Sequence, residues 1–325
     1  MNLTVPLINK HAVIVQINAL EHYIDDIWPI VHSSNLPIYL NSSSAKFVPF
    51  RALASLLQQA FVSLSHQDFK AFIRQGVNDY IKQISLNNSS MTSLSIPEQI
   101  AYLLPVKSVT FQPNTQITGS DTIQSLEFAL EDVTPFNLVA ELYAIVVVHQ
   151  YLASTQAVSQ PCKYHLFSEQ KTGLDKLNIS THTPQFMGQN STGIFYNSPE
   201  KPIGIVESTT WHKPPTPFSK QVALALECYI GRQDISINDF SYITGISPRS
   251  LQRYLKLEQS SFRKIKESLN MAFAKRVMRE RDVSISDIAE HLGYADTSQF
   301  IRAFRKAENT TPLQWRKKAC ATQQV

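Results

Sequence analysis

The sequence predicts an α+β amino-terminal domain, followed by an all-α carboxy-terminal domain in which a long helix joins two helix-turn-helix units. Two observations support this prediction. A pattern near the carboxy terminus occurs twice, as ISINDFSYITGIS followed by PRSLQRYLK and as VSISDIAEHLGYA followed by DTSQFIRAFRK. The amino-terminal two thirds of the chain mix helical apolar spacing with short β-rich segments, which polar and proline residues separate.

Each copy of the repeated pattern carries start and stop signals for two short helices. A serine precedes the first helix and an aspartate follows three residues later, which is capping-box spacing. A glycine then marks the turn, because glycine adopts positive φ at low cost. A second cap starts the next helix. These residues are Ser236, Asp239, Gly245 and Ser247 in the first copy, and Ser284, Asp287, Gly293 and Asp296 in the second.

The second helix of each copy is expected to bury one face and expose a polar one. Leu251 and Leu255, like Phe300 and Phe304, have the spacing of a buried face. The outward side chains are hydrogen-bonding types that read base edges in a major groove. The predicted DNA contacts are Arg249, Ser250, Gln252, Arg253, Thr297, Ser298, Gln299, Arg302 and Arg305. One copy alone could be a helical hairpin with a solvated face, but two in tandem favour DNA binding.

The segment between the copies, SFRKIKESLNMAFAKRVMRE, contains no proline or glycine. It predicts one helix of roughly 18 residues, about 27 Å long at 1.5 Å per residue. Successive major-groove openings on one face of B-DNA lie roughly 34 Å apart. We therefore expect this helix to hold two recognition helices in neighbouring grooves. Its basic residues are candidate phosphate contacts: Arg263, Lys264, Lys266, Lys275, Arg276 and Arg279.

Residues 235–318 resemble the DNA-binding domain of the AraC/XylS transcription regulators. The resemblance rests on GISPRSLQRYLK, on the spacing of Phe300, Arg302 and Phe304, and on the later Thr-Pro and Trp-Arg pairs. It departs from the family at Asn270, where the linker helix usually carries arginine, and at Asn309, where glycine usually precedes Thr-Pro. In that family, the residues that match the following contact DNA: Arg249, Gln252, Arg253, Thr297, Ser298 and Arg302.

The resemblance implies a sequence-specific transcription regulator of double-stranded promoter or operator DNA. Activation, with contact to RNA polymerase, is the family's commoner mode, although these residues do not distinguish it from repression. Charge agrees with this assignment. Residues 211–325 hold 19 lysines and arginines against 11 acidic residues, a net charge of +8, whereas residues 1–210 have a net charge of −4. The basic part is expected to attract phosphate, and the acidic part to be repelled by it.

The amino-terminal region predicts helices over residues 19–31, 49–64, 67–84 and 135–153, and strands at SVTFQP, SLEFAL, KYHLF and GIFYN. In order and length it loosely resembles the ligand-binding domain of the subfamily that includes ornithine-utilisation regulators, through VPFRALASLL and PQFMGQNSTGIFYNSPEKPIG. That resemblance implies a domain that senses a small molecule, dimerises, or does both. The predicted pocket residues are Tyr39, Phe50, Arg51, Tyr143, His149, Tyr164, Phe186 and Phe195.

The predicted domain boundaries are a regulatory domain over residues 1–210, a proline-rich linker over 211–219 and the DNA-binding domain over 220–325. No apolar run reaches the length of a membrane span, and no signal peptide is evident. Three widely spaced cysteines suit a reducing cytoplasm. Nine histidines without short paired spacing predict no metal site. We expect no cofactor, and the small-molecule effector is not identified.

Two alternatives stay open. An α+β domain of this size could be an enzyme fused to a DNA-binding module, although the chain has no GxSxG motif, P-loop or GxGxxG motif. The expectation is therefore that it is not an enzyme. The second alternative is a ligand-independent architectural protein that binds DNA without sequence preference. Such a protein should be basic along its whole length, which the acidic amino-terminal part opposes.

Overall fold

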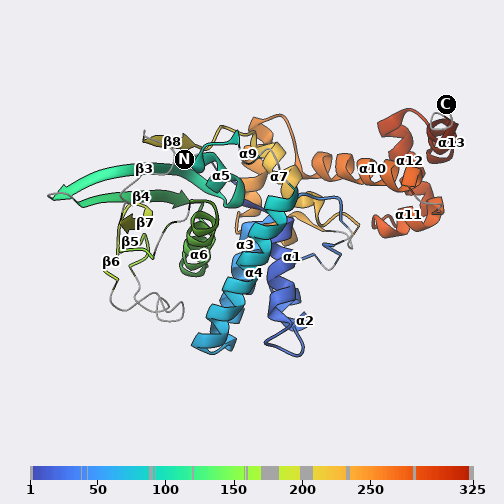
Figure 1. The fold of residues 1–325 in the computed structure, drawn as a ribbon. Helices are drawn as coiled ribbons and strands as arrows, with labels where there is room; N and C mark the ends of the chain where they lie inside the picture. Colours follow the sequence, from blue (N-terminus) through green and yellow to red (C-terminus); the bar gives the residue numbers. More distant parts are fainter. Residues whose placement is uncertain are drawn as a thin grey trace. The chain divides into compact units, whose positions relative to one another are not determined.

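The computed structural model describes residues 3–37, 39–41, 43–87, 91, 93–118, 121–156, 158, 160–169, 183–197, 208–231, 235–280 and 283–321. The chain divides into two compact units. The amino-terminal unit comprises Pro6–Asn41 and Phe47–Pro215, and the carboxy-terminal unit comprises Met1–Val5, Ser42–Lys46 and Thr216–Val325. The first unit is α+β and the second is helical, as the sequence predicts (Figure 1).

A six-stranded sheet forms one layer of the amino-terminal unit (Figure 1). Its order is β6 (Gln185–Phe186), β5 (Lys163–His165), β7 (Thr192–Asn197), β4 (Asp121–Leu130), β3 (Val106–Thr118) and β8 (Thr209–His212). The pairs are antiparallel except for β5 with β6, which is parallel. Phe111 lies opposite Leu126 and Val109 opposite Phe128, and all four side chains are buried. Side chains two residues apart share one face of a sheet, so this face of the β3–β4 hairpin belongs to the core.

Helices complete the core of this unit. The helix α6 (Asn137–Thr155) contacts β7 and two further helices, α3 (Phe50–Ser63) and α4 (His66–Asn87). Two shorter helices, α1 (Lys10–Leu20) and α5 (Ile96–Leu103), pack against α4 and β3 respectively. A small antiparallel pair, β1 (Leu7–Asn9) and β2 (Phe47–Pro49), lies beside α1. The helix α1 passes so close to Gly76 of α4 that a Cβ there would lie 2.5 Å from the Gln16 side chain.

The apolar residues of helix α6 pack in the core of the amino-terminal unit. Among the described residues it is the one helix that has the length and composition of a membrane span. More than half of that span is buried inside the protein, and Leu142, Ile145 and Val148 are almost fully buried.

Three of the four helices predicted for this region are present, as α3, α4 and α6. The fourth, over residues 19–31, is wrong because α1 ends at Leu20 and α2 (Trp28–Ser33) is a separate helix. A continuous helix could not pass Pro29, whose ring clashes with the preceding turn and which has no N–H to donate. Instead, Asp26 Oδ1 accepts a hydrogen bond from the Trp28 amide at 3.1 Å. The four predicted strands lie in β3, β4, β5 and β7.

The segment 211–219 enters regular structure at both ends. Trp211 and His212 belong to β8, because they pair with Val109 and Ser108 of β3. Phe218 and Ser219 open the helix α7 (Phe218–Glu227) of the carboxy-terminal unit. A proline-rich stretch without helix or strand remains between them.

The described part of the carboxy-terminal unit continues with six more helices. They are α8 (Ile237–Thr244), α9 (Pro248–Leu257), α10 (Phe262–Glu280), α11 (Ile285–His291), α12 (Thr297–Glu308) and α13 (Pro312–Ala321). Ser236 and Asp239 form a capping box at the start of α8, and Ser284 Oγ accepts a hydrogen bond from the Asp287 amide at α11. Asn309 ends α12 with φ 54°, a left-handed conformation that asparagine tolerates.

The helix α10 contributes to the packing of both helix pairs. Near its start, the Phe262 ring packs on Phe240 of α8, with centroids 5.4 Å apart. Its second half supplies Met271, Ala274 and Met278 to a core cluster shared with α11 and α12. The remaining members of the cluster are Ile288, Ala289, Leu292, Phe300 and Phe304.

Two short amino-terminal segments also belong to the carboxy-terminal unit. The Val5 amide donates a buried hydrogen bond of 2.8 Å to Gln221 Oε1 of α7. Ala45 and Val5 are both almost fully buried. The unit is therefore assembled from three separate stretches of chain.

Candidate nucleic-acid interface and ligand cavity

Side-chain caps fix the starts of the two helices that carry the predicted DNA contacts. Ser247 Oγ accepts a hydrogen bond from the Ser250 amide at 3.2 Å, and Asp296 Oδ1 accepts one from the Gln299 amide at 2.7 Å. Gly245 and Gly293, which precede these caps, have φ of 73° and 77°. Each turn therefore uses a glycine where other residues would be strained.

The predicted DNA contacts lie on the outer faces of α9 and α12. Seven of the nine side chains are exposed, and Ser250 and Thr297 are half-buried. Thr297 Oγ1 donates to Ser286 Oγ of α11 at 3.2 Å, which joins the two helices of that pair. The opposite faces hold Leu251, Leu255, Phe300 and Phe304, all fully buried.

A groove between α10 and α12 gathers several of these polar groups. It encloses about 390 Å³ and brings Gln299 and Arg302 beside Arg263 and Lys266. Its other lining residues are Glu267, Asn270, Leu292, Gly293, Tyr294 and Ala303. Burial raises the pKa of Tyr294, while a hydrogen bond with Asn270 opposes the rise. Asn270 thus fills a buried position beside Tyr294.

The other basic residues of α10 differ in what they contact. Lys275 Nζ forms an ion pair with Glu308 at 2.8 Å. The guanidinium groups of Arg276 and Arg279 lie over the rings of Phe273 and Trp315, at 5.3 and 5.0 Å from the centroids.

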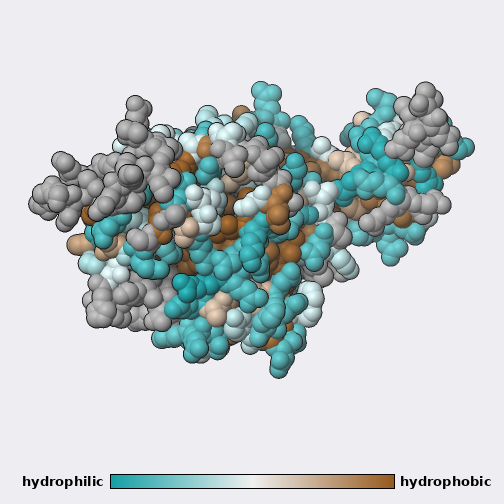
Figure 2. All heavy atoms as spheres, viewed as in Figure 1, coloured by the Kyte–Doolittle hydropathy of each residue, from teal (hydrophilic) through white to brown (hydrophobic). Residues whose placement is uncertain are grey.

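Figure 2 shows a mostly hydrophilic visible surface over α11 and α12.

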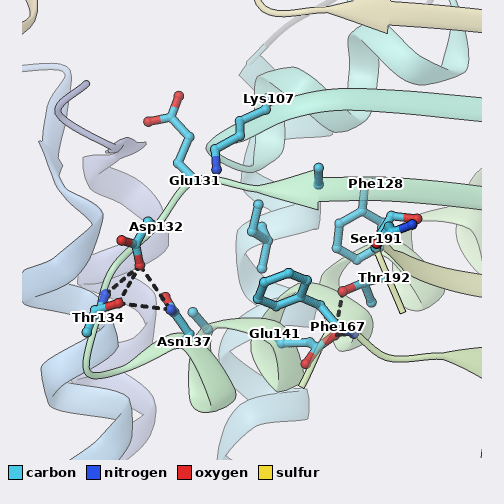
Figure 3. Close-up of a pocket in the computed structure, with 14 residues that line it drawn as sticks. Lys107, Phe128, Glu131, Asp132, Thr134, Asn137, Glu141, Phe167, Ser191 and Thr192 are labelled. Carbon is cyan, nitrogen blue, oxygen red and sulfur yellow. Dashed lines mark hydrogen bonds between the residues drawn. The ribbon is translucent and has the colours of Figure 1, made fainter. Parts of the chain in front are cut away.

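A second candidate site is a cavity of about 400 Å³ in the amino-terminal unit, where β4 ends and α6 begins (Figure 3). Its lining is mixed, with charged and polar groups around an apolar middle. The residues are Lys107, Phe128, Ala129, Leu130, Glu131, Asp132, Thr134, Asn137, Ala140, Glu141, Phe167, Asn190, Ser191 and Thr192.

Glu141 is a buried carboxylate in the wall of this cavity. It accepts hydrogen bonds from Thr192 Oγ1 and from the amides of Phe167 and Ser168, the last two at 2.7 and 3.1 Å. Burial raises the pKa of Glu141 despite these three donors. The carboxylate also ties α6 to β7 and to the chain after β5.

Asp132 lies at the other polar end of the cavity. Its Oδ1 accepts hydrogen bonds from the Thr134 amide, from Thr134 Oγ1 and from Asn137 Nδ2 at 3.0, 2.6 and 2.9 Å (Figure 3). Burial alone would raise its pKa, but these bonds and nearby Lys107 lower the pKa of Asp132. Glu131 forms an ion pair with Lys213.

The eight predicted pocket residues lie in several places, and none of them lines this cavity. Phe50 and Tyr143 are fully buried with ring centroids 6.5 Å apart, whereas Tyr39 is 66% exposed. The remaining five make the following contacts. Arg51 Nε donates a hydrogen bond to the Thr134 carbonyl, and His149 Nδ1 is 3.2 Å from Tyr196 Oη. Tyr164 pairs with Ile194 in the sheet. The rings of Phe186 and Phe195 both pack on His165.

The predicted pocket residues are mostly aromatic, whereas charged and polar residues make up most of the cavity lining. Two signals could have found them. Glu141 is a single carboxylate within the apolar run of α6. Asp132 and Thr134, just before that helix, form a polar cluster with Asn137, its first residue. Among the described residues, no group of three or more His, Cys, Asp or Glu side chains could hold a metal ion.

The carboxy-terminal unit contains a carboxylate cap that makes a pH-dependent prediction. Glu258 accepts hydrogen bonds from the amides of Phe218 and Ser219 at the start of α7, both at 2.7 Å. Burial opposes ionisation, but these bonds outweigh it and lower the pKa of Glu258. Its stabilisation is therefore present above the ordinary glutamate pKa of 4.5, and it is lost as pH falls through the lower folded value.

Replacing Glu258 with glutamine is expected to cost about 1 kcal/mol at pH 7, the usual scale of a helix cap. The difference from the unmodified protein should shrink as the pH falls below 4.5. Urea unfolding at pH 7 and pH 3.5, monitored by helical circular dichroism, measures both values. Glu290→Gln, at an exposed position of α11, controls for loss of charge. An equal cost at both pH values would contradict the capping role.

Comparison with known proteins gives matches for the carboxy-terminal region. Residues 241–318 match the family model described as "Helix-turn-helix domain". The HTH-type transcriptional regulator RipA of Corynebacterium glutamicum is 31% identical over 102 residues, which are 30% of this chain and 30% of RipA. YdeO of Escherichia coli K12, also an HTH-type transcriptional regulator, is 43% identical over 67 residues, 21% of this chain and 26% of YdeO. The chain therefore spans less than a third of the length of these relatives.

Solved structures give weaker similarity. The transcriptional regulator CdpR of Pseudomonas aeruginosa aligns over 89% of this chain and 97% of its own, with 14% identity and a TM-score of 0.32. A regulator of Chromobacterium violaceum, described by its AraC-type DNA-binding domain, aligns over 31% of this chain and 91% of its own. Its identity is 25% and its TM-score is 0.29.

Proposed function

Because residues 241–318 form a helix-turn-helix domain of the AraC type, we propose that this chain is a sequence-specific DNA-binding regulator of transcription. Two helix-turn-helix units, α8 with α9 and α11 with α12, present α9 and α12 as recognition helices. Arg249, Ser250, Gln252 and Arg253 read one stretch of bases. The second stretch is read by Thr297, Ser298, Gln299, Arg302 and Arg305.

The observation that carries this proposal is the repeated division of α9 and α12 into a fully buried apolar face and an exposed hydrogen-bonding face. Side chains that protrude from a capped, rigid helix can form bidentate contacts with base edges. The 19-residue helix α10 separates the two units and is about 28 Å long at 1.5 Å per residue. That length suits neighbouring major grooves, roughly 34 Å apart.

The amino-terminal unit acts as the regulatory part of this protein, by sensing a small molecule, by dimerising, or by both. A cavity of about 400 Å³ supports the sensing role. A ligand that prefers one arrangement of the regulator shifts its affinity for DNA. Activation is supported by the names of two relatives, the transcriptional activators NphR of a Rhodococcus species and PerA of E. coli O127:H6. The proposal includes contact with RNA polymerase in the cytoplasm.

Selection from a random DNA pool with the full-length protein tests the function. We expect enrichment of one sequence, in which two protected major-groove segments lie roughly 10 base pairs apart on one face. Binding without enrichment would instead support an architectural DNA-binding protein. Sedimentation at several concentrations, with and without DNA, tests dimerisation, and a monomer throughout would remove that part of the proposal.

A further inference from the structure

We propose that the cavity between β4 and α6 binds a small organic monocation, an aliphatic ammonium or guanidinium, whose charged group lies beside Glu141. The inference rests on the proposed function for its regulatory meaning, since such a ligand would be the effector. The cavity volume of about 400 Å³ lies within the range of small-molecule sites.

Among the described residues, one carboxylate that lines the cavity, Glu141, has no positively charged partner. Glu131 is paired with Lys213, and Asp132 is influenced by Lys107. In the described part of the chain, Glu141 has only neutral donors: one hydroxyl and two backbone amides. A buried carboxylate is costly unless a positive charge balances it. A cationic ligand group would supply that charge.

The residues in the middle of the cavity indicate the chemistry of the uncharged part of the ligand. Phe128, Leu130 and Ala140 give an apolar wall suited to a short aliphatic body. The Phe167 ring is 58% exposed, and its backbone amide is bonded to Glu141. Figure 3 shows the ring and the carboxylate close together. A cation beside Glu141 can therefore also lie against an aromatic face, which favours positive over neutral groups.

Isothermal titration of the full-length protein with four probes of similar size tests this ligand class. The probes are n-butylammonium, n-butylguanidinium, n-butanol and n-butyrate. We expect the two cations to bind at least tenfold more tightly than butanol, and butyrate to bind most weakly. Glu141→Gln should weaken binding of both cations at least tenfold and leave butanol unchanged. Glu21→Gln removes an exposed carboxylate of the same unit that does not line the cavity, and it should change nothing.

A second variant keeps the test decisive if Glu141→Gln fails to fold. Ala129 lines the cavity from a half-exposed strand position, so Ala129→Leu should reduce its volume and weaken all probes that bind. Three results would overturn the proposal. Butanol could bind as tightly as the cations, or neither cation could bind at millimolar concentration. Alternatively, Ala129→Leu could leave cation binding unchanged. DNA selection by the same preparation without any probe tests the proposed function separately.

Discussion

Replacing Phe304 with alanine is expected to lower the free energy of unfolding of the carboxy-terminal unit by about 3–5 kcal/mol. The side chain is fully buried, and its ring centroid lies 5.8 Å from Phe300 and 6.3 Å from Trp315. It belongs to the cluster on which the second half of α10 packs. A loss of this size is a large part of the stability of an ordinary domain, about 5–15 kcal/mol.

Hydrogen exchange measured by mass spectrometry over residues 283–318 detects this loss locally. Leu313→Ala is the matched control, because Leu313 is 50% exposed on α13 and its truncation should cost less than about 0.5 kcal/mol. Phe304→Ala should also weaken binding to preferred and random DNA alike, since α12 would no longer be held in place. Unchanged protection of α12 would contradict the packing argument.

Arg253→Ala and Arg302→Ala are each expected to weaken binding to the preferred DNA site by about 1–3 kcal/mol, the scale of a bidentate base contact. Both side chains are exposed, so folding stability should change little. Random DNA should lose much less affinity, because it offers no matched base. Fluorescence anisotropy with the selected site and with scrambled DNA, at one salt concentration, measures both losses.

Lys306→Ala provides the comparison from the same helix, since Lys306 is also exposed on α12 but is not one of the predicted base contacts. If it contacts phosphate, its loss should weaken all sequences equally and reduce the salt dependence by about one charge. Equal losses on both DNAs for Arg302→Ala would make that arginine a phosphate contact and remove it from the reading face.

The helices of the carboxy-terminal unit were predictable because their signals are local. A serine or aspartate cap and a left-handed glycine act within a few residues of the helix ends that they define, as Ser236 and Gly245 show. The four-residue spacing of Phe300 and Phe304, which places both on one helix face, likewise depends on one helix only. No local signal indicated the burial of Asn270 beside Tyr294, because it depends on α10 packing against the turn between α11 and α12.

The amino-terminal unit was less predictable because distant contacts decide its elements. The helix α1 contains Val13, Ile14 and Val15, a β-branched run that favours a strand in isolation. Packing against α4, with Gly76 leaving room for Gln16, stabilises the helix instead. The cavity was missed for the same reason, since Glu141, Phe167 and Thr192 come from three separate parts of the chain.

The bond between Val5 and Gln221 has a practical consequence for transferring the carboxy-terminal unit to another protein. A fusion that starts at residue 216 would omit Met1–Val5 and Ser42–Lys46 and would leave the Gln221 amide oxygen without its donor. The portable module is thus discontinuous. Chimaeras that retain these two short pieces should be the ones that remain intact.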